Sequence, residues 1–258
     1  MNKPWQKYVL PEDQESEIWE LFHENSKLDT HTKSLSEQEV LARMADLSEA
    51  LPYLGYPIIE LSAASLPITL PLGQAITARA SRRELAEQTV SIEALSSLLH
   101  LAYGQNRDNK ETGYPRPFRV APSAGALYPL ELYVLNLRVK HLAPGLYHFN
   151  PAHHHLRLLS SGNHVDNVAA ALVQPELAHC ASLIIFITSL FERSTFKYGA
   201  RGYRFALLEA GHVAQNVNLV TTALNLGSVN IGGYFDRAVD KFLGLDGIRH
   251  STVYAIAL

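Results

Sequence analysis

The segment FKYGARGYR (196–204) places three cationic side chains and two tyrosines in a 258-residue chain whose formal net charge is −3. It lies between a strongly apolar run, SLIIFITSL (182–190), and a long helical pattern. Lys197 and Tyr198 are adjacent here, and either side chain type can act as an acid or a base when burial or nearby charge shifts its pKa. The position of this cationic and aromatic cluster between two predicted buried elements therefore raises the question of what it does there.

Two arginines flank a hydroxyl in the segment RASRR (79–83). At alternate positions of an extended segment, Arg79, Ser81 and Arg83 face the same side. A guanidinium binds two phosphate oxygens at once because its planar fork matches their geometry. The segment predicts a phosphate clamp, and a solvated basic turn is the alternative interpretation.

Two glycine-containing segments predict close approach of the backbone to a ligand. In PSAGALYP (122–129), Gly125 lies between two alanines, so backbone N–H and C=O groups can reach the edge of a flat polar ring. In NIGGYF (230–235), Gly232 and Gly233 follow a predicted strand, where glycines often mark contact with a ligand. A tight turn and a β-bulge are the competing interpretations. Neither segment has the spacing of a P-loop or a dinucleotide fingerprint.

The longest helical pattern, from Tyr203 to Leu226, has polar side chains on an otherwise apolar surface. Buried polar side chains need hydrogen-bond partners, which the backbone, another subunit or a cofactor can provide. These polar residues are Glu209, His212, Gln215 and Asn216.

Three consecutive histidines (153–155) look like a metal-binding tract by composition alone. Neighbouring residues of a strand point to opposite faces, so they chelate one ion poorly. A single cysteine also excludes an intrachain disulfide and a cysteine-based zinc site. We predict a solvent-facing turn at 153–155 and no metal site.

Helices and strands must position these residues. Apolar side chains at helical spacing predict two amphipathic helices within 13–50 and a helix from Ser91 to Gly104. The run 182–190 predicts a central strand that is buried on both faces. Further strands are predicted at 131–139, 146–149, 228–235 and 252–258, connectors or loops at 51–76 and 105–119, and a helix cap at Gly227. This mixture predicts an α+β fold.

Composition narrows the class of protein. The chain is 47% hydrophobic and 18% charged, which is ordinary for a globular protein. A net charge of −3 argues against binding nucleic acid through its phosphates. No apolar stretch approaches about 18 residues and the N-terminus has no apolar signal segment, so we predict a cytoplasmic protein without a membrane span.

Five segments resemble, in order, the nitroreductase superfamily of FMN-dependent enzymes, and more narrowly its SagB-type azoline dehydrogenases, which mature thiazole- and oxazole-modified peptides. They are RASRR, PSAGALYPLELYV, GLYHFNP, FKYGARGYRFALLEAGHVAQN and LGSVNIGGYFD. The resemblance implies a homodimer with an α+β sandwich, a central mixed or antiparallel sheet flanked by helices, and one FMN in each of two interface sites. It divides the chain into an N-terminal helical segment, 1–65, packed on an FMN-binding domain, 66–258.

The resemblance also assigns roles to single residues. Arg79, Ser81 and Arg83 would hold the FMN phosphate and ribityl chain, and Gly232 and Gly233 would pass beside the flavin. The residues that would line the isoalloxazine are Pro122, Ser123, Gly125, Ala126 and Leu127, with Gln215 and Asn216 as further polar contacts.

Two departures from the family pattern affect the phosphate site. Position 80 is alanine where many relatives carry a second arginine or a histidine, and the chain ends at Leu258 without the basic C-terminal residue of many nitroreductases. We therefore expect fewer phosphate contacts than in those relatives.

Lys197 and Tyr198 match the Lys-Tyr pair that azoline dehydrogenases require. Converting an azoline to an azole removes a hydride from one ring carbon and a proton from its neighbour, so a base must accompany the flavin. A lysine whose pKa is lowered by desolvation and by Arg201 or Arg204 would serve. Tyr198 would also serve, with its phenolate stabilised by Lys197, and both assignments stay open.

Other functions stay open as well. An NAD(P)H-dependent nitro- or quinone reductase needs no such base, an oxidase of carrier-bound nonribosomal azolines would use the same chemistry, and a silent peptide-binding subunit needs no flavin. The expected partners are an azoline-containing peptide, a second copy of the chain and a cyclodehydratase complex, with no nucleic acid and no membrane.

Overall fold

The computed structural model describes residues 18–30, 35–62, 66–85, 88–111, 113 and 115–258. The helices are α1 (Ile18–Asn25), α2 (Glu37–Asp46), α3 (Leu72–Ala78), α4 (Ile92–Tyr103), α5 (Val165–Ala169), α6 (Glu176–Cys180), α7 (Glu192–Tyr198), α8 (Arg201–Ala223) and α9 (Asp236–Leu243). The strands are β1 (Ile58–Glu60), β2 (Gln105–Arg107), β3 (Phe118–Arg119), β4 (Leu130–Asn136), β5 (Gly145–Asn150), β6 (His155–Ser161), β7 (Leu183–Leu190), β8 (Val229–Ile231) and β9 (His250–Ala257). The predicted α+β fold is confirmed.

Seven strands form one sheet in the order β1-β6-β5-β4-β7-β9-β8, and its neighbouring strands are antiparallel. The predicted central strand is confirmed, because β7 lies between β4 and β9 and is buried along almost its whole length. The register pairs Leu132 of β4 with Ile187 of β7. Such cross-strand pairs place apolar side chains of adjacent strands side by side on one face.

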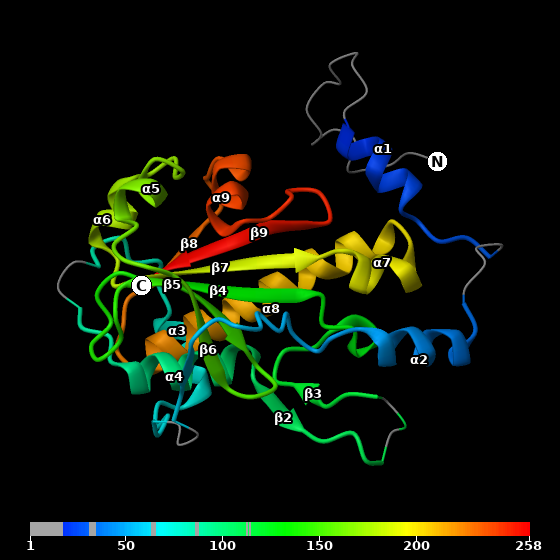
Figure 1. Cartoon of the computed structure of the whole chain (residues 1–258), viewed down its shortest axis with the longest axis horizontal. Coiled ribbons are helices and arrows are strands. Elements are labelled where there is room, and N and C mark those ends of the chain that lie inside the picture. The colour runs from blue at the N-terminus through cyan, green and yellow to red at the C-terminus, as the bar shows by residue number, and fades with distance from the viewer. Residues whose placement is uncertain (1–17, 31–34, 63–65, 86–87, 112, 114) are drawn as a thin grey trace.

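Helices cover both faces of this sheet, as Figure 1 shows. Successive residues of a strand point to opposite faces. Leu132 and Ile185 pack in one core with α4 and α8, whereas Tyr133 and Phe186 pack in a second core with α5, α6 and α9. The sheet is the middle layer of a sandwich, which is why its central strands are apolar on both sides.

Local signals set the ends of the two helices on the first face. Ser91 caps α4 as predicted, by accepting a hydrogen bond from a backbone N–H of the first turn, and the helix ends before Gly104. α8 ends at Ala223, and Asn225 adopts a φ of +55° just beyond it. The predicted cap at Gly227 is wrong because asparagine also tolerates the left-handed conformation.

Several short elements differ from the prediction. The supposed connector 51–76 contains β1 and most of α3, and α3 follows Pro71 because proline fits the start of a helix. The supposed loop 105–119 contains the paired strands β2 and β3. The predicted solvent-facing turn is wrong for His155, which is buried and begins β6. These elements and α7 are too short for hydrophobic periodicity to reveal. α9 was also not predicted, although its buried Val239 and Leu243 lie four residues apart among charged side chains, which is a helical pattern.

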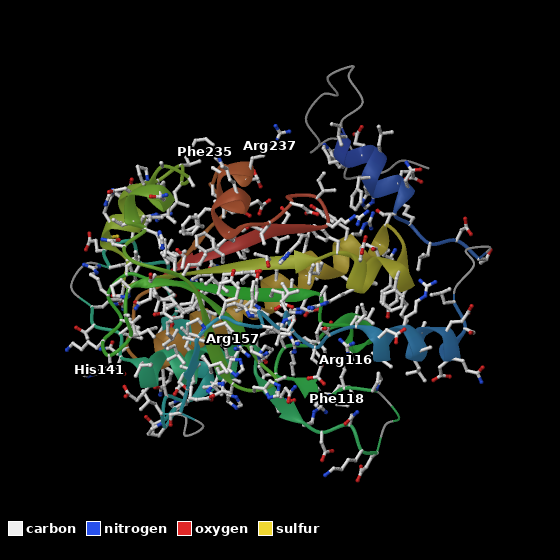
Figure 2. All side chains as sticks on the ribbon, in the orientation of Figure 1. Arg116, Phe118, His141, Arg157, Phe235 and Arg237 are labelled. Atoms are coloured by element: carbon white, nitrogen blue, oxygen red, sulfur yellow. The ribbon has the colours of Figure 1, made fainter. Side chains whose placement is uncertain are left out.

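The described part of segment 1–65 joins the sandwich at several points. β1 pairs with β6 at the edge of the sheet, and Met44 of α2 packs against Leu127. Arg116, labelled in Figure 2, donates hydrogen bonds to the carbonyl oxygens of Met44 (2.5 Å) and Leu47 (3.0 Å) at the end of α2. The division into two parts stays a prediction, and β1 belongs to the same sheet as the rest of the chain.

Candidate active site

Lys197 and Tyr198 form the last turn of α7, and both side chains reach the small-residue loop that precedes β4. A Cβ on Gly125 would lie 2.6 Å from Tyr198 Oη and 2.9 Å from Lys197 Nζ. Lys197 Nζ also lies 5.1 Å from the centre of the Tyr198 ring, and Phe205 of α8 packs edge-on against that ring. Two segments that the sequence marks separately therefore meet at one point.

The loop needs glycine at position 125. Gly125 has a φ of +63°, in the left-handed region, and any side chain there would displace the Tyr198 hydroxyl. Ala126 and Tyr128 also have positive φ, at +53° and +46°. Ser123 Oγ stabilises this turn by accepting a hydrogen bond from the Tyr128 N–H at 2.9 Å. Backbone strain of this kind is typical of functional loops that their surroundings hold in place.

Two contacts fix α7 against the sandwich. A Cβ on Gly202 would lie 2.8 Å from the backbone of α7, so α7 and α8 approach as closely as only glycine allows. On another side, Arg193 Nη1 forms a buried ion pair with Glu131 Oε1 of β4 at 2.6 Å. His148 Nε2 of β5 lies 2.6 Å from the other carboxylate oxygen. The helix that carries Lys197 is thus attached to the middle of the sheet.

The charge of Glu131 is stabilised in spite of its burial. Burial alone would raise the pKa of Glu131, but the Arg193 guanidinium and the hydrogen bond from His148 outweigh it and lower the pKa to about 2. The Leu51 N–H also donates to Oε1 at 3.0 Å. We did not single out Glu131 from the sequence, and the only signal was one charged residue at the start of an otherwise apolar strand.

A second buried carboxyl lies beneath the loop. Glu209 of α8 is 2% exposed, and Tyr103 Oη donates a hydrogen bond to its Oε1 at 2.7 Å. Burial raises the pKa of Glu209 to about 7, although the Tyr103 and Ser123 hydroxyls and the charge of Arg119 oppose the shift. The sequence marked Glu209 as a polar interruption of the helix and not as a site residue.

The first turn of α8 connects to α1. Arg204 donates a hydrogen bond to the carbonyl oxygen of His23 at 2.5 Å, and its guanidinium lies 5.9 Å from the Phe22 ring. Tyr203 packs edge-on against the same ring. Arg204 therefore extends toward α1, and of the two arginines predicted as alternatives beside the Lys-Tyr pair, Arg201 lies 5.8 Å from the Phe205 ring that packs on Tyr198.

The predicted phosphate clamp lies near the other end of α8. Ser81 forms a β-bridge with Ser228, and the Arg82 N–H donates to the Ser228 carbonyl at 2.9 Å. Arg82 and Arg83 line one cavity of about 680 Å³, so the segment does not keep the strict alternation predicted for it. Among the residues that the structure describes, neither Arg79 nor Arg83 has an ion-pair partner. Both guanidiniums are thus available to an anion.

The second glycine segment follows β8. A Cβ on Gly232 would meet nothing within 4 Å, whereas the Gly233 carbonyl accepts a hydrogen bond from the Val173 N–H at 3.0 Å. Two residues before Gly232, Asn230 Oδ1 is buried and has no hydrogen-bond partner in the described ranges. The open space beside Gly232 and the unpaired Asn230 oxygen fit a ligand that donates hydrogen bonds.

The side chains of the other predicted cofactor residues differ in their solvent exposure. Pro122 is exposed, but the side chain of Leu127 is buried in a core that includes α2, so only its backbone is free to meet a ligand. Gln215 is exposed on α8. Asn216 Nδ2 donates to the Ala102 carbonyl at 3.2 Å and thereby links α8 to α4. The cofactor roles of all four stay predictions.

The predicted site residues fall into two groups along α8. The α7 end comprises Lys197, Tyr198 and the 122–127 loop, and the β8 end comprises 79–83 and 232–233. Figure 1 shows α7 and α3 at opposite ends of α8. Ser228 Oγ lies 2.9 Å from the Thr221 hydroxyl. At 1.5 Å per residue, the helix between position 201 and position 221 is about 30 Å long, so one chain does not bring its Lys-Tyr pair to its own phosphate clamp.

Two other kinds of site find no support in the described part of the chain. None of the helices there is long and apolar enough to cross a bilayer. Within the same ranges, no three His, Cys, Asp or Glu side chains are grouped so that they could hold a metal ion.

Comparison with known proteins adds the family. The nitroreductase family model matches residues 76–258. The chain belongs to this family. A putative nitroreductase of Methanocaldococcus jannaschii is 36% identical over 175 residues, which cover 67% of this chain and 84% of that protein. The microcin B17-processing protein McbC of Escherichia coli is 33% identical over 147 residues, which cover 51% of this chain and 49% of McbC. The match thus spans about half the length of McbC.

Solved structures show the same fold. A chain of the E. coli microcin synthetase McbBCD complex with truncated pro-MccB17 bound has a TM-score of 0.58 and 22% identity, covering 93% of this chain and 90% of that one. A putative nitroreductase in complex with FMN from Desulfovibrio desulfuricans has a TM-score of 0.50 and 23% identity, covering 73% of this chain and 84% of that one. The predicted nitroreductase-like sandwich is confirmed.

Proposed function

We propose that the chain is an FMN-dependent dehydrogenase that oxidises thiazoline or oxazoline rings of a peptide to thiazoles or oxazoles. The observation that carries the proposal is the convergence of Lys197 Nζ and Tyr198 Oη on Gly125, in the loop predicted to line the flavin. A reductase that passes on a stored hydride needs no base at this position. The similarity to McbC supports a peptide as the substrate.

The residues at both ends of α8 fit an FMN. Arg79 and Arg83, which have no ion-pair partner in the described ranges, would hold the phosphate together with Ser81. The backbone of the 122–127 loop would meet the flat ring, and the open face of Gly232 leaves room beside it. When bound, FMN supplies the two-electron acceptor for the hydride.

The protein itself handles the proton. One member of the Lys197–Tyr198 pair takes the proton from the ring carbon, and the other stabilises the resulting change of charge. If Tyr198 is the base, the Lys197 ammonium stabilises its phenolate. If Lys197 is the base, the Tyr198 hydroxyl oxygen accepts a hydrogen bond from the ammonium that forms. The contact with Gly125 fixes where both groups stand.

We infer that two copies of the chain complete each site. Leu207 and Leu208 on α8 are 41% and 59% exposed, and Leu72 and Ile76 on α3 are 67% and 52% exposed. A second copy related by a two-fold axis would cover these apolar side chains. With the two α8 helices antiparallel, the α7 end of one chain lies against the β8 end of the other. This arrangement would unite the two groups that one chain separates.

The central experiment measures azole formation on an azoline-containing peptide, as a mass loss of about two daltons per ring. Lys197→Ala should abolish this loss and retain the bound FMN. Lys241→Ala, on the distant helix α9, is the matched control and should keep full activity. Full azole formation by Lys197→Ala would overturn the assignment of the pair.

A mixing experiment tests the shared site. Lys197→Ala and Arg79→Glu should each be inactive alone. If each site takes Lys197 from one chain and Arg79 from the other, a mixed dimer has one site with both native residues, and activity returns on mixing. If one chain supplies both residues, no mixture regains activity.

The family relationship favours a second candidate, an NAD(P)H-dependent reductase, because the putative nitroreductase matches over 84% of its length. Bleaching of the bound flavin by NADPH, followed by reduction of a nitroaromatic compound, would support this candidate. Oxidation of a carrier-bound azoline in place of a peptide would identify a nonribosomal pathway. A cyclodehydratase that delivers the peptide is proposed as partner, by analogy with the microcin synthetase complex.

A further inference from the structure

A cavity of about 300 Å³ lies beside the start of α7, at the other end of this helix from Lys197 and Tyr198. Two neighbouring aromatic side chains line it: Phe191, which precedes α7, and Tyr203, in the first turn of α8, with ring centres 4.9 Å apart. Tyr234, from the segment after β8, adds a third ring. The volume is near the lower limit for ligand pockets, so it suits one side chain of a ligand better than a whole cofactor.

Two aspartates make this cavity acidic. Asp236, at the start of α9, is exposed and lines the cavity. Asp240, one turn further along α9, is buried, and its carboxylate accepts hydrogen bonds from Ser251 Oγ and the Thr252 N–H, both at 2.7 Å. Ser251 and Thr252 also line the cavity. Among the described residues, neither aspartate has an ion-pair partner.

The cationic side chains of the neighbouring elements extend elsewhere. Arg249 lies 3.5 Å from Glu192 on the surface. Arg204 donates a hydrogen bond to the carbonyl oxygen of His23 in α1. Figure 2 shows Arg237 on α9, extending away from the sheet. None of these three arginines lines the cavity, so the described part of the chain supplies no cation to it.

We propose that this cavity binds a lysine or arginine side chain of the bound peptide. The inference rests on the proposed function, which supplies a peptide as the ligand. A cation over the face of an aromatic ring is attracted by the quadrupole of the ring, and a carboxylate beside the rings adds a charge of opposite sign. An anionic side chain would meet two aspartates, and an apolar one would displace water from the Asp236 carboxylate without replacing its hydrogen bonds.

The position of the cavity indicates where the basic residue lies in the peptide. Phe191 directly precedes α7, and Lys197 follows it by six positions. At 1.5 Å per residue, they are about 9 Å apart along the helix. An extended peptide advances about 3.3 Å per residue, so a basic residue about three positions from the azoline ring would reach the cavity. Leu207, an exposed side chain of the proposed interface, also lines the cavity, which therefore borders the site that two copies would share.

The test compares azoline-containing peptides that differ only in the residue three positions from the ring, before or after it. Their termini are acetylated and amidated, so that lysine, methionine or glutamate at this position sets the charge. With the FMN-loaded full chain, lysine should raise kcat/KM for azole formation about three- to thirtyfold over methionine, as a cation–π contact with a nearby carboxylate implies. Asp236→Asn and Tyr234→Leu should each lower this ratio, and the two changes together should bring it closer to one.

A matched control separates the loss of the site from a general effect of charge. Asp166→Asn removes the same charge from the first turn of another helix, α5, where the aspartate is exposed and does not line the cavity. This variant should keep the preference for lysine. A second readout needs no turnover: fluorescence anisotropy of labelled, azole-containing product peptides should show tighter binding with lysine than with methionine, and added salt should reduce the difference.

Size-exclusion chromatography tests the other possible occupant, a basic side chain of a second copy of the chain. Asp236→Asn should elute at the same volume as the unsubstituted protein. Dissociation of a dimer in this variant would assign the cavity to the second copy and overturn the inference.

The outcomes distinguish this inference from the proposed function. Equal kcat/KM for the three peptides, or a lysine preference that both single variants retain in full, overturns the inference and leaves the function standing. Lysine-dependent binding that Asp236→Asn weakens, in a protein that leaves azolines intact, supports the inference and refutes the function. Absence of both peptide binding and azole formation refutes both.

Discussion

Replacing Gly125 with alanine tests whether the loop sets the position of the Lys197–Tyr198 pair. The new Cβ would stand 2.6 Å from Tyr198 Oη, whereas ordinary van der Waals contact begins at 3.4 Å. The hydroxyl must therefore move by about 0.8 Å to restore ordinary contact. A misplacement of about 1 Å can slow a reaction by on the order of 10²-fold. Alanine in the left-handed conformation adds about 1–2 kcal/mol of destabilisation, which should lower the Tm by about 2–8 °C.

The assay is kcat for azole formation at saturating FMN and peptide, together with thermal unfolding. Gly244→Ala is the matched control, because Gly244 ends α9 with a φ of +73° and a Cβ there would meet nothing within 4 Å. This control imposes the backbone strain without the crowding. We expect a similar loss of Tm in both variants and a large loss of kcat only in Gly125→Ala. Turnover by Gly125→Ala at the unsubstituted rate would refute the positioning argument.

Two further predictions concern stability. Glu131→Gln leaves Arg193 buried without its charged partner, so denaturant titration should show a loss of about 3–5 kcal/mol in the free energy of unfolding. Because the pKa of Glu131 is lowered from 4.5 to about 2 in the folded state, its ionised carboxylate stabilises the fold by about 3 kcal/mol at pH values above 4.5. This contribution is lost as the pH falls from 4.5 toward 2. Stability of Glu131→Gln should be flatter in this acid range, and an unchanged acid profile would show that another group dominates. Arg116→Ala should speed amide hydrogen exchange in α2 and leave the sheet protected, unless apolar contacts alone hold that helix.

The two halves of the site were predictable because each is encoded locally. A glycine between small residues at 125, and a lysine next to a tyrosine at 197, are visible within a few positions of the sequence. Their contact is not visible in this way, because it depends on the pairing of β4 with β7 and on where α7 packs. The family resemblance proposes a chemistry for the pair, which stays a prediction, and it leaves the geometry open.

The burial of two carboxyl groups near the site was also not predictable from the sequence. Glu131 is the second residue of a strand whose other residues are mostly apolar, and Glu209 interrupts the apolar surface of a long helix. Either residue could have faced solvent, since a charged side chain is most often exposed. The partners that make their burial tolerable, Arg193 for one and Tyr103 for the other, are far away in the sequence. Only the packing of helices on the sheet brings them together.

The start of β4 is linked to both the 122–129 loop and α7, which form the two sides of the site. Glu131 lies two residues after the 122–129 loop and pairs with Arg193 on α7. Arg193 and Lys197 are four residues apart, so they lie on the same face of the helix, one turn from each other. The ion pair that attaches α7 to the sheet therefore also sets the direction in which Lys197 extends toward Gly125. Loss of that ion pair should weaken the fold and misplace the Lys197–Tyr198 pair through the same displacement.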